Sequence, residues 1–121
     1  MKYALALTLV LVAVQKDPTA SDVSAAIVNG GVAIYATLNN PSMYDAYVQS
    51  GTSDAGKVVL RDGEKTTSNI TIPSFGFVEL TKDGPFVLIT DLKGQPKAGD
   101  TIKVTLDTDG GVAIAIAAIV K

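Results

Sequence analysis

Two absences define what chemistry this chain can do. None of its 121 residues is histidine or cysteine, the side chains that most often ligate copper, act as general bases near neutral pH or attack as nucleophiles. Serine and threonine are plentiful, but without histidine a triad-type hydroxyl has no base. The carboxylates fall mostly in turns, where solvation explains them. The sequence therefore predicts a protein that is not an enzyme and has no catalytic residue and no cofactor.

Two short motifs and the aromatic residues carry the remaining chemical possibilities. Residues 107–111 (Asp-Thr-Asp-Gly-Gly) begin like a calcium loop but lack its later oxygen ligands and terminal Glu, so we interpret them as a hairpin turn. Asn69-Ile70-Thr71 is a glycosylation sequon, which makes Asn69 a possible glycosylation site if the chain is exported. Most aromatic residues are interpreted as core or rim packing, because no basic stripe accompanies them: Tyr35, Tyr44, Tyr47, Phe75, Phe77 and Phe86.

Composition limits the class of protein further. A mass of 12.5 kDa suits one domain with a single two-layer core. The net charge of −2 marks no nucleic-acid-binding surface, and no small-molecule substrate is evident. Charged residues make up only 18% of the chain, below the ~25% typical of soluble domains, so little charge repulsion keeps copies apart.

Short apolar runs separated by Gly, Asn and Asp turn signals predict an all-β fold. Residues 101–106 alternate cleanly, with Ile102, Val104 and Leu106 on one face, as expected of a half-exposed antiparallel strand. Many short strands with hairpin turns indicate a Greek-key sandwich or barrel. The predicted strands are 22–28, 31–39, 44–50, 56–61, 66–72, 76–81, 85–92, 101–108 and 111–120.

The first apolar segment, residues 4–14, and the last, residues 112–117, alternate large and small side chains with the period of a β-strand. Both faces of each segment are apolar, which indicates burial on both sides. Residues 1–20 have two interpretations. Lys2 followed by Tyr3–Val14 fits a secretory signal peptide, although the cleavage site is poorly formed and the run is short of the ~20 residues of a membrane span. Alternatively, the polar linker 15–21 lets the segment leave its own domain as a strand donated to a groove in a neighbouring subunit.

The donated-strand interpretation predicts a head-to-tail contact, which does not close on itself and builds a fibre. The last strand, 112–120, would be the sheet neighbour of the donated strand. The interface would comprise Ala4, Leu5, Ala6, Leu7, Thr8, Leu9, Val10, Leu11 and Val12 from the donor and Val112, Ile114 and Ile116 from the acceptor.

From about Asp22 onward the sequence resembles the periplasmic copper chaperone family written PCu(A)C. Six blocks carry the resemblance through their order and spacing: Gly31–Pro41, Ala55–Leu60, Ile72–Pro73, Val78–Leu80, Asp91–Lys93 and Ala98–Ile102. The resemblance implies a cupredoxin-like Greek-key β-sandwich.

The family's copper ligands are His and Met, and none is found at the matching positions. The His expected after Val-x-Leu is Arg61, and the His-x-Met motif before Asp-Leu-Lys is replaced by Phe86 and Leu88. The whole chain has only Met1 and Met43. Because imidazole and thioether donors select Cu(I), we expect no copper cofactor and no metal site.

The sequence thus predicts a cupredoxin-like β-sandwich over residues 22–121, preceded by an apolar segment and linker over residues 1–21. We expect an exported structural subunit, extracellular or on the cell surface, that polymerises through its N-terminal strand and has no membrane span in its mature form. The alternative is a monomeric extracytoplasmic interaction module, related to copper chaperones, that has lost copper binding. In that case the mature chain would start near Ser21.

Overall fold

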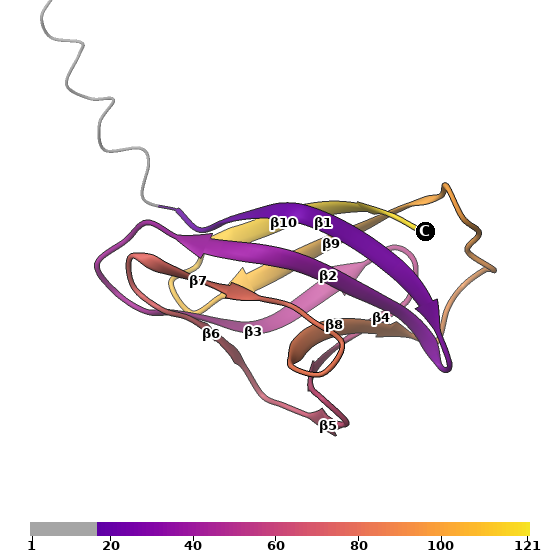
Figure 1. Ribbon diagram of the computed structural model, residues 1–121, viewed down its shortest axis with the longest axis horizontal. Helices are drawn as coiled ribbons and strands as arrows, with labels where there is room; N and C mark the ends of the chain where they lie inside the picture. Colours follow the sequence, from indigo (N-terminus) through magenta and orange to yellow (C-terminus); the bar gives the residue numbers. More distant parts are fainter. Residues whose placement is uncertain (1–16) are drawn as a thin grey trace, which may run out of the picture.

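The computed structural model describes residues 17–121, which form strands and no helix (Figure 1). No helix in this part of the chain is long and apolar enough to cross a membrane. The strands are β1 (Thr19–Val28), β2 (Gly31–Asn40), β3 (Ala46–Ser53), β4 (Lys57–Asp62), β5 (Lys65–Thr66), β6 (Ile70–Ile72), β7 (Gly76–Glu79), β8 (Pro85–Thr90), β9 (Thr101–Thr108) and β10 (Ala113–Ile119).

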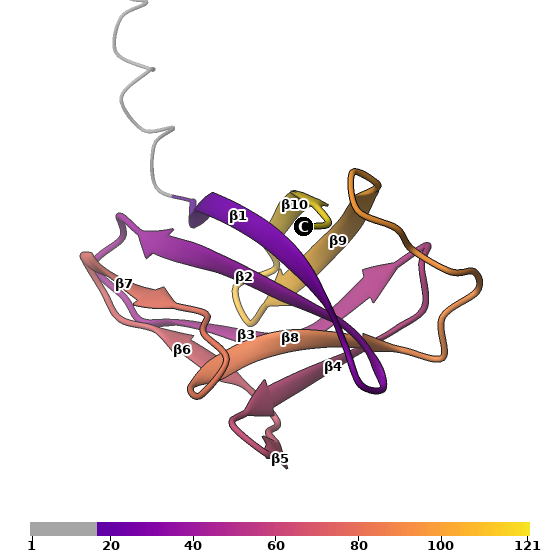
Figure 2. The same cartoon turned by 45° about the vertical axis from the view of Figure 1, so that its right-hand side comes forward.

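The strands make two antiparallel sheets that lie face to face (Figures 1 and 2). The first sheet has the order β1-β2-β8-β4-β5, with β7 also paired to β2, and the second has the order β10-β9-β3-β6. The chain crosses between the sheets after β2 and again after β3, as in a Greek-key sandwich. The predicted all-β, Greek-key sandwich is confirmed.

One predicted strand is two strands in different sheets. Residues 66–72 were expected to be continuous, but β5 pairs with β4 in the first sheet, whereas β6 pairs with β3 in the second. The Thr67 hydroxyl donates to the carbonyl of Asn69 at 3.2 Å in the connection between them. Ile70 and Ile72 are buried, so the segment changes sheets in order to place these two side chains in the core.

Alternation along the strands builds the core. In β2 and β8, every second side chain points between the sheets, for example Ile34, Leu38 and Val87, which are fully buried. The second sheet contributes in the same way through β9 and β10. One contiguous apolar cluster holds the two sheets together.

The last strand is buried on one face only, contrary to the expectation of burial on both. Ile114 and Ile116 point into the core of their own domain, 2% and 4% exposed, and Val112 is half-buried just before β10. The alanines that alternate with them are exposed: Ala113, Ala115 and Ala117. The two isoleucines therefore do not line a groove that is open to another subunit.

Strand β10 ends its sheet and approaches the start of the other. Val120 bridges to Ala25 in parallel fashion, and the amide of Lys121 donates to the Ala25 carbonyl at 3.0 Å. Strand β1 begins at Thr19, inside the segment predicted to be a linker. The predicted donor residues 4–12 lie outside the described residues, and the division of the chain at residue 21 stays a prediction.

One buried polar side chain fastens the loops at one end of the sandwich. Asn40, 2% exposed, donates through Nδ2 to the carbonyls of Tyr44 and Ile72 at 2.8 and 2.9 Å. Its Oδ1 accepts from the amide of Ser42 at 3.0 Å. The β2–β3 loop is thereby tied to β6 across the gap between the sheets.

Replacing Asn40 by alanine should lower the free energy of unfolding by about 2 kcal/mol, because three backbone groups lose their partner and a buried group without a partner costs about 1–3 kcal/mol. Urea denaturation measures the change. Asn39→Ala is the matched control, since that side chain donates only to the hydroxyl of Ser21 at the surface, and a change within about 0.5 kcal/mol is expected. Equal losses in the two variants would contradict the role assigned to Asn40.

Candidate functional site

The three positions matched to copper ligands come together on the outer face of the first sheet. Arg61 in β4 lies directly opposite Phe86 in β8, and Leu88 follows two residues later on β8. Cross-strand partners share a face, as do residues two apart on one strand. Because the intervening Val87 is fully buried, all three lie on the other face of the sheet from it, and Phe86 is partly buried there and still packs against the core cluster.

Tyr35 of β2 joins these residues. Its ring lies 6.1 Å from that of Phe86, centroid to centroid, with the planes inclined at 51°, a favourable tilted arrangement. Strand β8 lies between β4 and β2, and Leu88 is paired with Ala33 of β2. We refer to Tyr35, Arg61, Phe86 and Leu88, all half-buried, as the Arg61 cluster.

The guanidinium of Arg61 is partly withdrawn from water. Its Nε is buried and has no hydrogen-bond partner among the described residues. A fixed positive charge thus stands at one of the positions where the family pattern has an imidazole, beside two hydrocarbon side chains that carry no lone pair.

Carboxylates do not assemble a metal site elsewhere in the described chain either. Residues 17–121 contain no group of three or more His, Cys, Asp or Glu side chains placed to hold a metal ion. Met43 lies in the β2–β3 loop and is 64% exposed, apart from the Arg61 cluster.

The first of the two short motifs is a surface turn, and the second, Asn69-Ile70-Thr71, runs from the β5–β6 connection into strand β6. Residues 107–111 close the β9–β10 hairpin, where the Thr108 amide donates to the Val112 carbonyl and Asp109 accepts from the Tyr47 amide, both at 3.0 Å. The interpretation as a hairpin turn is thus confirmed. Asn69 is exposed between β5 and β6, and its glycosylation stays a prediction.

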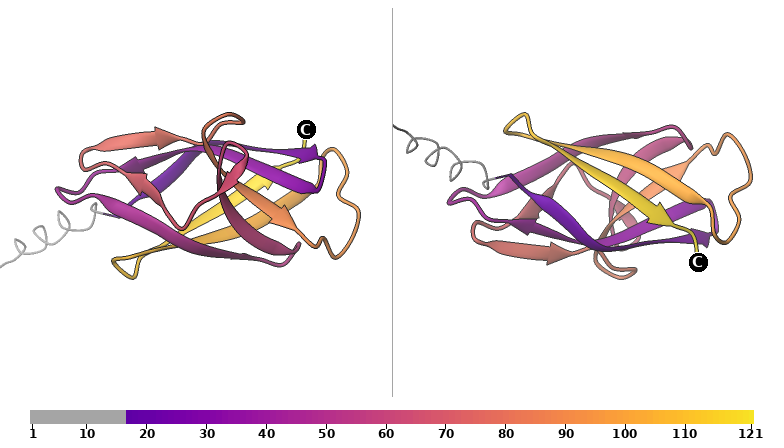
Figure 3. Two further views of the ribbon diagram at one scale, coloured as in Figure 1. Left: turned by 90° about the horizontal axis from the view of Figure 1, so that it is seen from below. Right: turned by 90° about the horizontal axis from the view of Figure 1, so that it is seen from above.

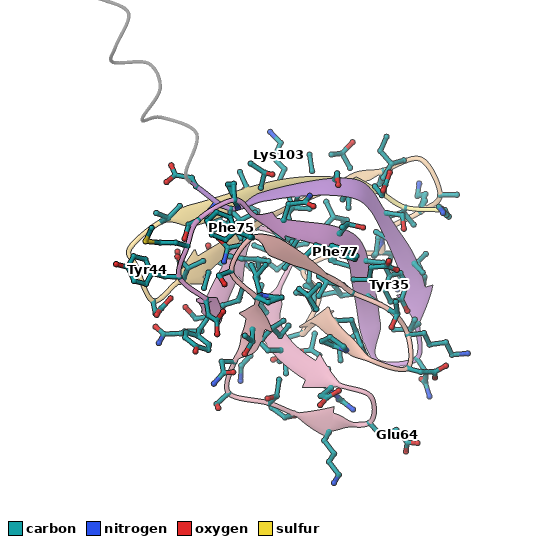
Figure 4. The ribbon with its side chains drawn as sticks, turned by 60° about the vertical axis from the view of Figure 1, so that its left-hand side comes forward. Tyr35, Tyr44, Glu64, Phe75, Phe77 and Lys103 are labelled. Carbon is teal, nitrogen blue, oxygen red and sulfur yellow. The ribbon has the colours of Figure 1, made fainter. Side chains whose placement is uncertain are left out.

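Three aromatic side chains of the described chain are mostly exposed to solvent. Tyr44, Phe75 and Phe77 are all more than half exposed, and Figure 4 shows Tyr44 and Phe75 toward the same end of the sandwich. The position of Phe75 in the turn sequence Pro73-Ser74-Phe75-Gly76 was the only signal in the sequence that could have indicated this exposure.

The family model that matches the chain is LpqE-like, described as "Putative lipoprotein LpqE-like", and it covers residues 8–120. No curated protein is similar enough to count as a match. The resemblance to PCu(A)C domains is confirmed by solved structures.

Two of the similar structures are PCuAC domains from one group of proteins. The copper-bound PCuAC domain from PmoF2 has a TM-score of 0.74 at 15% identity, covering 84% of this chain and 90% of that one. The apo PCuAC domain from PmoF1 has a TM-score of 0.75 at 16% identity, covering 84% and 91%. At such identities these two structures show the fold alone.

A third similar structure is the solution structure of CuI-DR1885 from Deinococcus radiodurans. It has a TM-score of 0.70 at 26% identity and covers 89% of this chain and 81% of that one.

These matches overturn the prediction of a filament subunit. The chain matches an LpqE-like family and PCuAC domains, so self-polymerisation by donor-strand complementation is wrong, and the alternative of a module related to copper chaperones fits better. In addition, Ile114 and Ile116 already face the core of their own domain.

The family description bears on location. A lipoprotein family supports an exported, cell-envelope protein and does not support an extracellular filament. These 121 residues contain no cysteine, the residue through which thiol-linked lipids attach. The model match over residues 8–120 shows that the chain belongs to the LpqE-like family.

Proposed function

We propose that this protein is a non-enzymatic interaction domain of the cell envelope, exposed outside the cytoplasm, that keeps the PCuAC fold and has lost copper binding. The observation that carries the proposal is the convergence of Arg61, Phe86 and Leu88 on one face of the sheet. The matched positions retain the spatial relation that a ligand set needs, and their side chains cannot act as ligands.

The chemistry of these side chains opposes copper in two ways. Phenylalanine and leucine offer no lone pair, whereas Cu(I) requires soft sulfur or imidazole donors. The guanidinium of Arg61 adds a positive charge that repels a metal cation at short range. The PmoF2 domain and DR1885, by contrast, are described as copper-bound and CuI forms.

The composition of the Arg61 cluster supports a role in binding another macromolecule. Arginine and tyrosine are enriched among the residues that dominate binding energies at protein interfaces, and Phe86 and Leu88 add half-buried apolar area beside them. The buried Nε of Arg61 has no partner within the described domain, which costs free energy in the folded state. A side chain that lowers the stability of the folded state is a candidate for a role in function.

The protein should show no tight stoichiometric binding of Cu(I). Titration with Cu(I) under a competing chelator measures this directly, and a one-to-one site of submicromolar affinity would contradict the proposal. The expectation depends on the absent donor set and not on the fold.

Restoring the donors should restore copper binding. The triple variant Arg61→His, Phe86→His, Leu88→Met places two imidazoles and a thioether on one face of β4 and β8, and it should bind one Cu(I) at least 100-fold more tightly than the unmodified chain. The control Lys103→His, Glu64→His, Tyr44→Met introduces the same groups at separate places (Figure 4) and should not gain this affinity. Equal affinities in the two variants would show that the ligand positions are matched wrongly.

Replacing Arg61 by methionine should raise the free energy of unfolding by about 1 kcal/mol, because the change removes a buried donor without a partner and keeps most of the hydrocarbon stem. Lys57→Met is the matched control on the same strand and face, where the side chain is exposed and a change within about 0.5 kcal/mol is expected. A loss of stability in Arg61→Met that the control does not show would mean that the guanidinium stabilises the fold.

A further inference from the structure

One end of the sandwich presents four large apolar side chains to solvent. Met43, Tyr44, Phe75 and Phe77 are 64, 74, 72 and 56% exposed. We refer to them as the aromatic end. They come from the β2–β3 loop, the β6–β7 loop and the adjoining strand β7. A cluster of exposed large apolar residues, unlike a single one, marks an interaction surface.

The two loops are held rigidly against each other. The amide of Phe75 donates to the carbonyl of Ser42 at 3.0 Å, and the amide of Ser74 donates to Oδ1 of Asp45 at 2.9 Å. Together with the hydrogen bonds of Asn40, these contacts fix the loops from which the apolar side chains project. The exposure is therefore built into the fold.

The backbone at Phe75 supports the same conclusion. Its φ is +51°, in the left-handed region that glycine and asparagine favour and bulky residues rarely adopt. Strained residues cluster at functional sites, where the surrounding structure holds them in place. At Phe75 this unfavourable backbone conformation accompanies an aromatic ring that is exposed to solvent and adds little to the core.

The chain enters the sandwich at this same end. Asp17 lines one surface hollow together with Phe75 and another together with Tyr44, and Figures 1 and 3 show the loops after β2, β6 and β9 grouped at the end where β1 begins. In the sequence, only two residues separate Asp17 from the apolar run Tyr3–Val14. Tyr3–Val14 contains no charged residue.

We propose that the aromatic end rests on the interface of a lipid bilayer. Aromatic rings sit favourably at the level of the headgroups, and methionine and phenylalanine gain by leaving water for the acyl boundary. The proposal does not depend on the loss of copper binding, because the aromatic end and the Arg61 cluster share no residue.

The charges at this end indicate the kind of lipid. The carboxylates of Asp17, Asp45 and Asp109 line one hollow with Tyr44. Carboxylates are repelled by an anionic surface, so the aromatic end suits zwitterionic headgroups. Phosphatidylcholine is therefore the appropriate probe.

The absence of tryptophan from the chain makes the test direct. Full-length Tyr44→Trp should bind vesicles of phosphatidylcholine with a blue-shifted emission, and lipids brominated on the acyl chains should quench that emission at least twofold. Glu64→Trp, near the β4–β5 hairpin and far from Tyr44 in Figure 4, is the control and should bind equally without shift or quenching.

Additional substitutions distinguish lipid contact at the aromatic end from contact with a protein partner. Tyr44→Ser combined with Phe75→Ser should weaken vesicle binding at least fivefold, whereas Glu64→Ser should leave it unchanged. The proposal is wrong if the protein does not bind the vesicles. It is equally wrong if bound Tyr44→Trp is quenched no more than Glu64→Trp, which would instead favour a protein partner for the aromatic end.

Discussion

The period-two alternation of side chains in β4 and β8 is the constraint on which both the fold and the candidate site depend. Val87 and Ile89 face the second sheet and are fully buried, so Phe86 and Leu88, which alternate with them along β8, lie on the other face. The same two strands thus supply core residues on one face and the positions of the Arg61 cluster on the other. Arg61 and Leu88 lie on the face away from the packing between the sheets, whereas Phe86 is partly buried and also packs against the core cluster.

Local signals in the sequence were sufficient to predict most strands. Turn dipeptides and clean alternation, as in residues 101–106, place strand boundaries because they depend only on neighbouring residues. The division of residues 66–72 between two sheets depends on long-range pairing with β3 and β4, which no local pattern reports. Alanine caused the error at β10, since a small apolar side chain is compatible with either face of a sheet, and Ala113 and Ala115 are in fact exposed.

The site was predictable in part, and only through the resemblance to PCu(A)C domains. The blocks of that resemblance identified Arg61, Phe86 and Leu88, but nothing in their spacing along the chain shows that Arg61 lies opposite Phe86, because that contact is set by the register of β4 on β8. Nor could composition distinguish a ring in the core from one in solvent. The exposure of Tyr44 and Phe75 depends on loops whose shape is fixed by hydrogen bonds such as those of Asn40. The filament prediction failed for a related reason: an alternating apolar segment is compatible with a strand, a leader or a membrane contact.

Two features of this domain oppose its stability, and both lie at its surface. A buried guanidinium nitrogen without a partner and a left-handed phenylalanine in solvent each cost free energy that a different side chain would save. The sandwich tolerates them because its core is continuous and its loops are tied by buried hydrogen bonds. Since they lie on different parts of the domain, one on the outer sheet face and one at the end where the chain enters, they can serve two contacts at once: the aromatic end toward the membrane, and the Arg61 cluster toward a protein that approaches from the side.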